Sequence, residues 1–220
     1  MDESSRQSRD VPTRSSIPTG GVPETARWRI VSLGADGTVG PVYPIAGDVT
    51  EMGRRGRDIA EPDDLQMADH HASLVYESGE WFIADSGEGS GVWIRINPAE
   101  GWPLESGDQI WLGSQILVAE KQGDRWTLAH YGPDGQLQKT HPIGEGGLFV
   151  GRGSENELAC NDGLLSRRHA QFCIRDGELQ VFDLGARNGT FAKVSGATAL
   201  EDGSVFRLSA KSYRLEFLQV

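Results

Sequence analysis

Three polar clusters in the last third of the chain combine residue types that can hold an anion. They are, in chain order, Gly151-Arg152, Ser166-Arg167-Arg168-His169 and Arg187-Asn188-Gly189-Thr190. Guanidinium groups form charge-assisted, often bidentate hydrogen bonds with phosphate oxygens, and a serine hydroxyl adds a short donor. An asparagine amide can pair with the backbone of an extended peptide. Because the clusters contain no carboxylate that could act as a catalytic base, they favour gripping a phosphate group on a peptide over transforming one.

The elements that must position these clusters occur twice. At an offset of 98 residues, Gly53-Arg54 matches Gly151-Arg152, and His71-Ala72 matches His169-Ala170. The same offset places Asp85, Gly87 and Gly91 on Asp183, Gly185 and Gly189. After a two-residue shift, residues 104–107 match residues 200–203. So many matches at one spacing indicate two copies of one domain, joined near Glu120 to Asp124.

Within each copy the segments are short and alternate between apolar and polar residues, which is typical of β strands. In the second copy the expected strands are Trp126–His130, Leu148–Gly151, His169–Ile174, Leu179–Asp183, Thr190–Lys193, Val205–Leu208 and Tyr213–Leu218. Turn sequences such as Pro133-Asp134-Gly135 separate them, and no segment shows a helical period over three turns. We therefore predict an all-β fold, with two antiparallel sheets packed as a sandwich in each copy.

The sequence predicts three regions. Residues 1–26 have almost no large apolar side chain and are expected to be a disordered tail. Residues 27–120 and 121–220 are expected to form one sandwich each. Single residues of the three clusters have ordinary alternatives, since an arginine before a loop is commonly a solvated charge and Asn-Gly is a common turn. The repeat outweighs these alternatives because it places all three clusters on one scaffold.

Composition narrows the class of protein. The net charge is −11, and residues 27–120 carry 16 acidic against 6 basic residues. Such a chain is not expected to bind nucleic acid through its overall field. No apolar stretch is long enough for a membrane span, and the polar N-terminus lacks a secretion signal, so we expect a cytoplasmic protein without membrane insertion. Cys160 and Cys173 have no zinc-ligand spacing and are expected to be reduced structural thiols.

The combined motif resembles the forkhead-associated (FHA) domain signature over residues 122–220. The resemblance implies a β-sandwich of about eleven strands that binds phosphothreonine peptides through its apical loops, without a cofactor or metal. It implies that Arg152 and Ser166 contact the phosphate, that Arg167 adds a phosphate or peptide contact, and that Asn188 holds the peptide backbone. Arg187 would help to set the preference after the phosphothreonine. Gly151, His169 and Gly189 would be architectural, His169 as a buried orienting residue.

The first copy, residues 27–120, resembles an FHA domain in its scaffold but is degenerate, because it departs from the motif at its binding positions. Arg54 is retained, but Ala68 stands at the position of Ser166, Asp69 at that of Arg167 and Ser90 at that of Asn188. Ala68 removes a phosphate donor, and Asp69 places a negative charge where a phosphate dianion should lie. We therefore expect that the first copy does not bind phosphothreonine. Its tryptophans Trp81, Trp93, Trp102 and Trp111 either fill the core or anchor an interface with a partner.

Three functions remain to be compared. The favoured one is a non-catalytic adaptor in Ser/Thr kinase signalling that binds a phosphothreonine protein, such as a kinase or its substrate, through the second copy. The alternative is a phosphate-independent scaffold or oligomerisation protein of a larger complex, for example in secretion. Catalysis has little support, because His70-His71 lacks a ligand pattern and Gly151-Arg152-Gly153 lacks the lysine of a nucleotide loop. Phosphorylation of Thr13, Thr19 or Thr25 would let the tail bind the second copy within the same chain.

Overall fold

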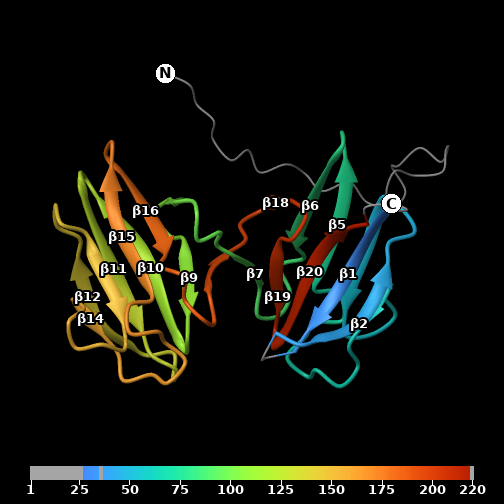
Figure 1. Cartoon of the computed structure of the whole chain (residues 1–220), viewed down its shortest axis with the longest axis horizontal. Coiled ribbons are helices and arrows are strands. Elements are labelled where there is room, and N and C mark those ends of the chain that lie inside the picture. The colour runs from blue at the N-terminus through green and yellow to red at the C-terminus, as the bar shows by residue number, and fades with distance from the viewer. Residues whose placement is uncertain (1–26, 35–36, 219–220) are drawn as a thin grey trace. The chain divides into compact units, whose positions relative to one another are not determined.

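The computed structural model describes residues 27–34 and 37–218, and every extended regular element in this part of the chain is a β strand (Figure 1). The predicted all-β fold class is therefore confirmed. The expected disordered tail, residues 1–26, lies outside the described residues. Among the described residues there is also no helix of the length and apolar character that a membrane crossing requires.

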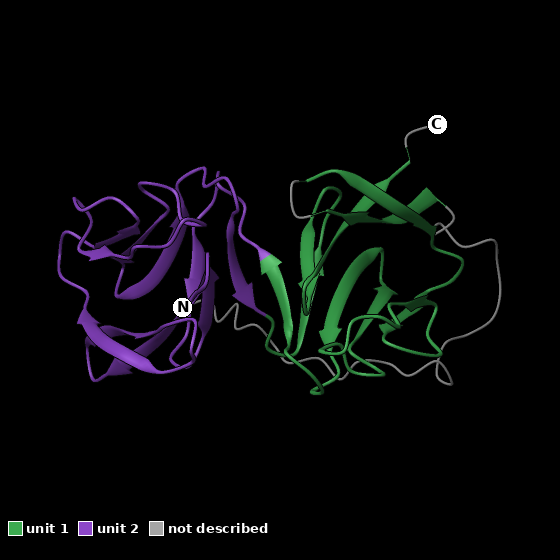
Figure 2. Ribbon diagram, turned by 90° about the horizontal axis from the view of Figure 1, so that it is seen from below, with its two compact units in different colours: residues 1–94, 194–220 green, residues 95–193 purple. Residues whose placement is uncertain are grey.

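The strands fall into two compact units, coloured separately in Figure 2: unit 1 is residues 1–94 with 194–220, and unit 2 is Arg95–Lys193. The strands of unit 1 are β1 (Trp28–Leu33), β2 (Val39–Pro44), β3 (Val49–Gly53), β4 (Ile59–Ala60), β5 (Ala72–Glu77), β6 (Glu80–Asp85), β7 (Val92–Arg95), β18 (Ala197–Leu200), β19 (Val205–Leu208) and β20 (Lys211–Phe217). Those of unit 2 are β8 (Trp102–Leu104), β9 (Gln109–Leu112), β10 (Gln115–Gln122), β11 (Arg125–Tyr131), β12 (Leu137–Pro142), β13 (Leu148–Gly151), β14 (Leu158–Ala159), β15 (Ala170–Arg175), β16 (Glu178–Asp183) and β17 (Thr190–Lys193).

Each unit builds two sheets of five strands. In unit 1 the strand orders are β7-β19-β20-β1-β2 and β18-β6-β5-β3-β4. In unit 2 they are β12-β11-β10-β9-β17 and β14-β13-β15-β16-β8. The short pairs β3–β4 and β13–β14 are parallel, at equivalent places in the two units. The prediction of two β-sandwiches in tandem is confirmed, with ten strands in the described part of each rather than about eleven.

The units divide the chain at other places than the repeat does. The repeat predicts sandwiches at residues 27–120 and 121–220, whereas the expected joint is the turn of a β-hairpin in unit 2, where Gln122 of β10 pairs with Arg125 of β11. Strands β8 to β10 of the first repeat complete the sandwich of the second repeat. Strands β18 to β20 of the second repeat complete the sandwich of the first. The two repeats have thus exchanged their last three strands.

The exchanged strands keep the same register in both units. Pro103 of β8 pairs with Gln180 of β16, and Ala199 of β18 pairs with Phe82 of β6. The repeat relates Pro103 to Ala199 and Phe82 to Gln180, so the two pairs are equivalent. Each exchanged strand therefore occupies the position that its counterpart would take in a repeat closed on itself.

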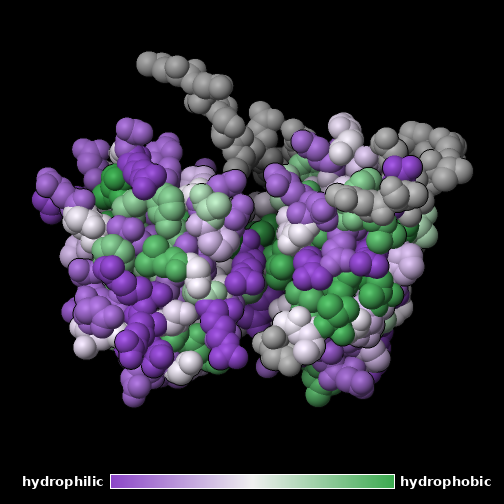
Figure 3. Space-filling view, in the orientation of Figure 1, coloured by the Kyte–Doolittle hydropathy of each residue, from purple (hydrophilic) through white to green (hydrophobic). Residues whose placement is uncertain are grey.

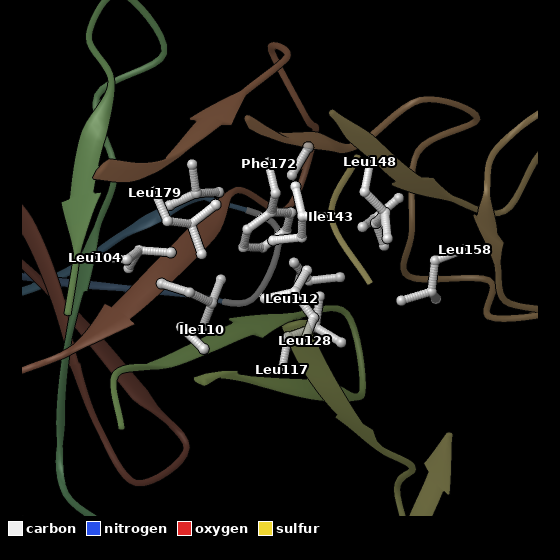
Figure 4. Close-up of a cluster of buried hydrophobic side chains, with 14 of the residues drawn as sticks. Leu104, Ile110, Leu112, Leu117, Leu128, Ile143, Leu148, Leu158, Phe172 and Leu179 are labelled. Atoms are coloured by element: carbon white, nitrogen blue, oxygen red, sulfur yellow. The ribbon is translucent and has the colours of Figure 1, made fainter. Parts of the chain in front are cut away.

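The hydrophobic core of unit 2 contains side chains from both repeats, which point toward one another in Figure 4. The labelled side chains from the first repeat are Leu104, Ile110, Leu112 and Leu117, and those from the second are Leu128, Ile143, Leu148, Leu158, Phe172 and Leu179. Burial of such apolar side chains is the main favourable contribution to folding. The stability of the second repeat's sandwich therefore depends on residues of the first repeat.

A partly buried carboxylate gives a physical reason for the exchange. The Glu61 side chain, 16% exposed, accepts a hydrogen bond from the Tyr213 hydroxyl at 3.0 Å and pairs with the Lys211 ammonium at 3.3 Å. In a first repeat closed on itself, the repeat would place Gln115 and Leu117 at the positions of Lys211 and Tyr213. Glu61 would then lose its cation and its hydroxyl donor, which is costly for a charge that is partly removed from water.

Of the tryptophans that the sequence singled out in the first repeat, two lie in the core of unit 1. Trp81 is 1% exposed and Trp93 is 6% exposed. Trp102 is half-buried and packs against the core of unit 2. For Trp81 and Trp93 the core role is therefore confirmed.

Candidate functional site

Three loops of unit 2 carry the residues that the sequence singled out. We call residues 152–157 loop A, residues 160–169 loop B and residues 184–189 loop C; they follow β13, β14 and β16. Backbone hydrogen bonds join loop A to loop B, from Arg152 N to Ser166 O at 2.9 Å and from Gly153 N to Arg167 O at 3.0 Å. Loop C joins loop B through Arg187 N, which donates to Ser166 Oγ at 3.3 Å. The structure thus brings the three clusters together at one end of the sandwich.

The approach of loops A and B requires the glycine at the end of β13. A Cβ atom on Gly151 would lie 2.2 Å from Arg167 O and 2.9 Å from Ser166 O. Backbone oxygens at such distances cannot be moved without displacing loop B. Gly151 therefore lets Arg152 enter loop A while loop B passes directly over the strand end.

Asn156 is a site residue that sequence reasoning missed. Its Nδ2 group donates at 2.7 Å to Gly153 O in loop A and at 2.7 Å to Arg167 O in loop B. The side chain is buried, with the residue 7% exposed. In the first repeat, where the loop between the equivalent strands is one residue shorter, Arg57 takes this place and donates from Nε to the equivalent carbonyl, Asp69 O, at 3.1 Å. A different residue type in the same role explains why comparison of the repeats did not reveal it.

Loop B presents a hydroxyl and orders the amide of loop C. Ser166 Oγ accepts the Arg187 amide, which leaves the hydroxyl hydrogen available to an anion. Asn188 Nδ2 donates to Leu164 O at 2.7 Å, so the orientation of the Asn188 amide is set and its Oδ1 atom faces away as an acceptor. Asn188 is exposed. This hydrogen-bonding capacity suits an extended peptide backbone.

His169 lies in the interior and connects loops B and C. Its Nδ1 atom accepts from Ser166 N at 3.1 Å, and the other ring nitrogen lies 3.1 Å from Gly189 O. Since a carbonyl can only accept, Nε2 donates and the imidazole is the neutral Nε2–H tautomer. Burial lowers the pKa of His169, which keeps it neutral. His169 is fully buried, so it can orient Ser166 but cannot reach a ligand.

The turn of loop C is held by a buried carboxylate. Asp183 Oδ1 accepts from Gly185 N and Ala186 N, both at 2.8 Å. Gly189 has a φ of +74°, and a Cβ there would lie 2.4 Å from Arg95 Nε. Only glycine adopts this backbone and fits this space without strain. Gly189 therefore permits the turn that carries Arg187 and Asn188.

The cations of the three loops are not neutralised by neighbouring carboxylates. Arg152, Arg167 and Arg187 are exposed, and in the part of the chain that the structure describes none of them forms an ion pair. Arg168 differs, because its guanidinium stacks over the Phe149 ring at 4.0 Å. The loops therefore offer three guanidinium groups and a hydroxyl to an anion. Within residues 27–34 and 37–218, no group of His, Cys, Asp and Glu side chains is placed to hold a metal ion.

Comparison with known proteins identifies the family of this scaffold. The profile of the FHA domain matches residues 50–113 and 148–209. The chain belongs to the FHA family. It is 36% identical over 71 residues to the Oxoglutarate dehydrogenase inhibitor of Corynebacterium glutamicum, covering 31% of this chain and 48% of that protein. It is 33% identical over 76 residues to the FHA domain-containing protein FhaB of Mycobacterium tuberculosis, covering 33% of this chain and 49% of that protein.

The chain spans about half the length of these curated relatives. Among solved structures, an FHA domain of an Arabidopsis thaliana hypothetical protein is 15% identical with a TM-score of 0.38, covering 94% of this chain and 96% of that one. The two profile matches fall one in each repeat, so the resemblance expected for both repeats is confirmed.

The first FHA repeat has the same loop scaffold, but its arginine is already paired with a carboxylate of the same repeat. Arg54 N donates to Ala68 O at 2.8 Å, and the ring nitrogens of His71 lie 3.1 Å from Ala68 N and from Gly91 O, as those of His169 do in the second repeat. The Arg54 guanidinium, however, binds Asp69 Oδ1 through both Nε and NH2 at 2.9 Å. Asp69 thus supplies the carboxylate that faces Arg54, where a phosphate would have to compete with it.

Proposed function

We propose that the chain is a non-catalytic adaptor that binds phosphothreonine peptides through its second FHA repeat. In this proposal Arg152 and Ser166 contact the phosphate, Arg167 adds a second cation, Asn188 holds the peptide backbone and Arg187 contributes to residue preference after the phosphothreonine. The observation that carries the proposal is the contrast between the repeats. The same scaffold holds a free guanidinium and a hydroxyl in one repeat, and a guanidinium paired with Asp69 beside an alanine in the other.

The proposal extends to the setting of the protein. The partner would be a phosphoprotein of a Ser/Thr kinase pathway in the cytoplasm, either the kinase or its substrate. The names of the curated relatives, an inhibitor and an FHA domain protein, support a regulatory rather than a catalytic role. The tail threonines Thr13, Thr19 and Thr25 lie outside the described residues, and binding of a phosphorylated tail to the second repeat is part of the proposal.

Calorimetry on the full chain tests the proposal, with a phosphothreonine peptide and its unmodified and phosphoserine counterparts. We expect affinity for the phosphothreonine peptide alone, weakened roughly tenfold or more by Arg152→Ala and by Ser166→Ala, since each removes a charge-assisted hydrogen bond. Arg54→Ala is the matched control, because it removes the equivalent arginine of the first repeat. Equal affinity for the modified and unmodified peptides, or an equal loss with Arg54→Ala, would defeat the proposal.

The first repeat is proposed to make a phosphate-independent interaction. Figure 3 shows apolar side chains gathered in patches on an otherwise mainly hydrophilic surface. In unit 1, Val39 and Val42 of the edge strand β2 are 64% and 45% exposed. Exposed apolar side chains on an edge strand can form a contact surface for an apolar partner. Self-association that survives phosphatase treatment and Ser166→Ala, but is lost in Val42→Asp, would support the phosphate-independent scaffold function over the phosphothreonine-binding one.

A further inference from the structure

The strand exchange places residues of the first repeat beside loop B of the second. The turn between β9 and β10 carries Ser114 and Gln115, and both contact Asp162, at the start of loop B. Asp162 Oδ2 accepts from Ser114 N at 2.8 Å, from Ser114 Oγ at 2.7 Å and from Gln115 Nε2 at 3.0 Å. One carboxylate oxygen of the second repeat is thus surrounded by three donors from the first.

The orientation of the Gln115 amide is set on its other side. Gln115 Oε1 lies 2.9 Å from His130 Nε2, and the amide oxygen can only accept, so His130 donates to it. Gln115 Nε2 therefore faces Asp162 and the hydroxyl of Ser114, the latter at 2.9 Å. Gln115 is 6% exposed. A buried amide with both ends satisfied is a rigid support.

Asp162 in turn hydrogen-bonds to the backbone beside the residues that would face the ligand. Its Oδ1 atom accepts from Leu164 N at 2.9 Å, and its backbone carbonyl accepts from Leu165 N at 3.1 Å. Leu164 O in turn accepts from Asn188 Nδ2 at 2.7 Å, and Leu165 immediately precedes Ser166. Burial acts to raise the pKa of Asp162, but the hydrogen bonds from Gln115, Ser114 and Leu164 outweigh it and lower the pKa to about 2.

The equivalent carboxylate in unit 1 is held less firmly. Asp64 Oδ1 accepts from Ser209 Oγ at 3.0 Å and from Gln66 N at 3.0 Å. Its Oδ2 atom is buried and has no hydrogen-bond partner among the described residues. The fuller set of donors therefore occurs in the unit whose loops keep their binding residues.

We propose that Ser114 and Gln115 are positioning residues of the phosphopeptide site in the second repeat, acting through Asp162 on Ser166 and Asn188. This inference rests on the proposed function and deepens it: the first FHA repeat contributes a structural part of the site that the second repeat carries. Groups that hydrogen-bond to binding residues without touching the ligand hold those residues in their productive geometry, and their loss weakens binding without removing a ligand contact.

Affinity for the phosphothreonine peptide in the full chain tests the inference. We expect Ser114→Ala and Gln115→Met to weaken binding about threefold to tenfold, and Ser114→Thr, which keeps the hydroxyl donor, to bind like the wild type. Ser209→Ala is the matched control, because it removes the hydroxyl that contacts Asp64 in unit 1. Hydrogen exchange of the Leu164 amide should quicken in Ser114→Ala and stay unchanged in Ser209→Ala.

The outcomes separate this inference from the proposed function. If the wild type shows no preference for the phosphorylated peptide, the proposed function fails and the inference fails with it. If the wild type does show that preference but Ser114→Ala and Gln115→Met bind equally well, only the inference fails. An equal loss with Ser209→Ala would also overturn it, because the effect would then follow general destabilisation.

Disulfide trapping tests which repeat supplies the strands. In a Cys160→Ser/Cys173→Ser background, Phe82→Cys with Ala199→Cys places the two thiols on paired residues of β6 and β18. We expect this pair to oxidise within the monomer, with the bond mapped by mass spectrometry. Ala199→Cys with Gln180→Cys is the control, since these residues would pair only in a repeat closed on itself. Efficient bonding of the control pair, with none in the first pair, would place Ser114 away from Asp162 and overturn the inference.

Discussion

The hydrogen bond from Tyr213 to Glu61 can be removed with little other change. Tyr213 is fully buried, its hydroxyl lies 3.0 Å from Glu61 Oε1 and its ring stacks on Phe206 with centroids 5.6 Å apart. Burial and the neighbouring Glu61 raise the pKa of the hydroxyl, so it remains a donor. Tyr213→Phe keeps the ring and removes only the donor. A hydrogen bond to a charged group contributes about 1.5–3 kcal/mol, and the retained Lys211 favours the lower end.

We therefore expect Tyr213→Phe to lower the free energy of unfolding by about 1.5–2 kcal/mol. Equilibrium urea denaturation measures this loss, and hydrogen exchange of unit 1 amides locates it. Tyr131→Phe is the control, because the half-buried Tyr131 hydroxyl has no hydrogen-bond partner in the described part of the chain, and we expect a change of less than about 0.5 kcal/mol. A double-mutant cycle with Glu61→Gln isolates the pair.

Two results would refute this reasoning. The first is a Tyr213→Phe variant as stable as the control. The second is strict additivity of Tyr213→Phe and Glu61→Gln, since two groups in contact should be coupled by about 1 kcal/mol. Either result would mean that Tyr213 does not lie against Glu61, and the physical reason given for the strand exchange would be lost.

Three further predictions concern the loops. Gly151→Ala should destabilise the chain by about 2–4 kcal/mol in urea denaturation, because its Cβ would meet Arg167 O at 2.2 Å, whereas Gly163→Ala, with open space around it, should be neutral. The pKa of Asp162 is lowered to about 2 from an ordinary 3.8, so its ionised form stabilises the fold at neutral pH. This stabilisation is lost as the pH falls from about 4 to about 2. Discounted for partial exposure, this amounts to about 1 kcal/mol, so the stability gap to Asp162→Asn should narrow on acidification, and a widening gap would contradict it. Finally, Ala68→Ser/Asp69→Arg/Ser90→Asn should free Arg54 and raise the calorimetric stoichiometry for phosphopeptide above that of the wild type; an unchanged stoichiometry would count against the account of the first repeat.

Much of the scaffold could be predicted from the sequence because its strands alternate cleanly. Leu148–Gly151, Thr190–Lys193 and Val205–Leu208 have the bounds that the pattern predicts. The strands that were missed carry little pattern. β12 is exposed along most of its length, β14 has two residues and β18 buries only Leu200, so none of them shows an apolar alternation.

The loop clusters could be found because the repeat preserves glycines that the backbone requires, as at Gly151 and Gly189. The strand exchange could not be found in the same way. The last three strands of the two repeats have the same alternation and the same turns, so either set fits either sandwich as far as pattern is concerned. The choice depends on single pairs such as Glu61 with Lys211, which lie far apart in the chain. Asp162 was also missed, because its partners come from the other repeat.

The pairing of β1 with β20 has a consequence for synthesis. Arg29 and Glu216, which pair across these strands, are 187 residues apart. On the ribosome, all the strands of unit 2 are available once Lys193 has emerged, whereas unit 1 must wait for its closing strand although its first strands were made earlier. The nascent chain therefore holds an open sheet edge through most of its translation, and such long-range closure is slow. Chaperone dependence during this interval would follow directly from the topology.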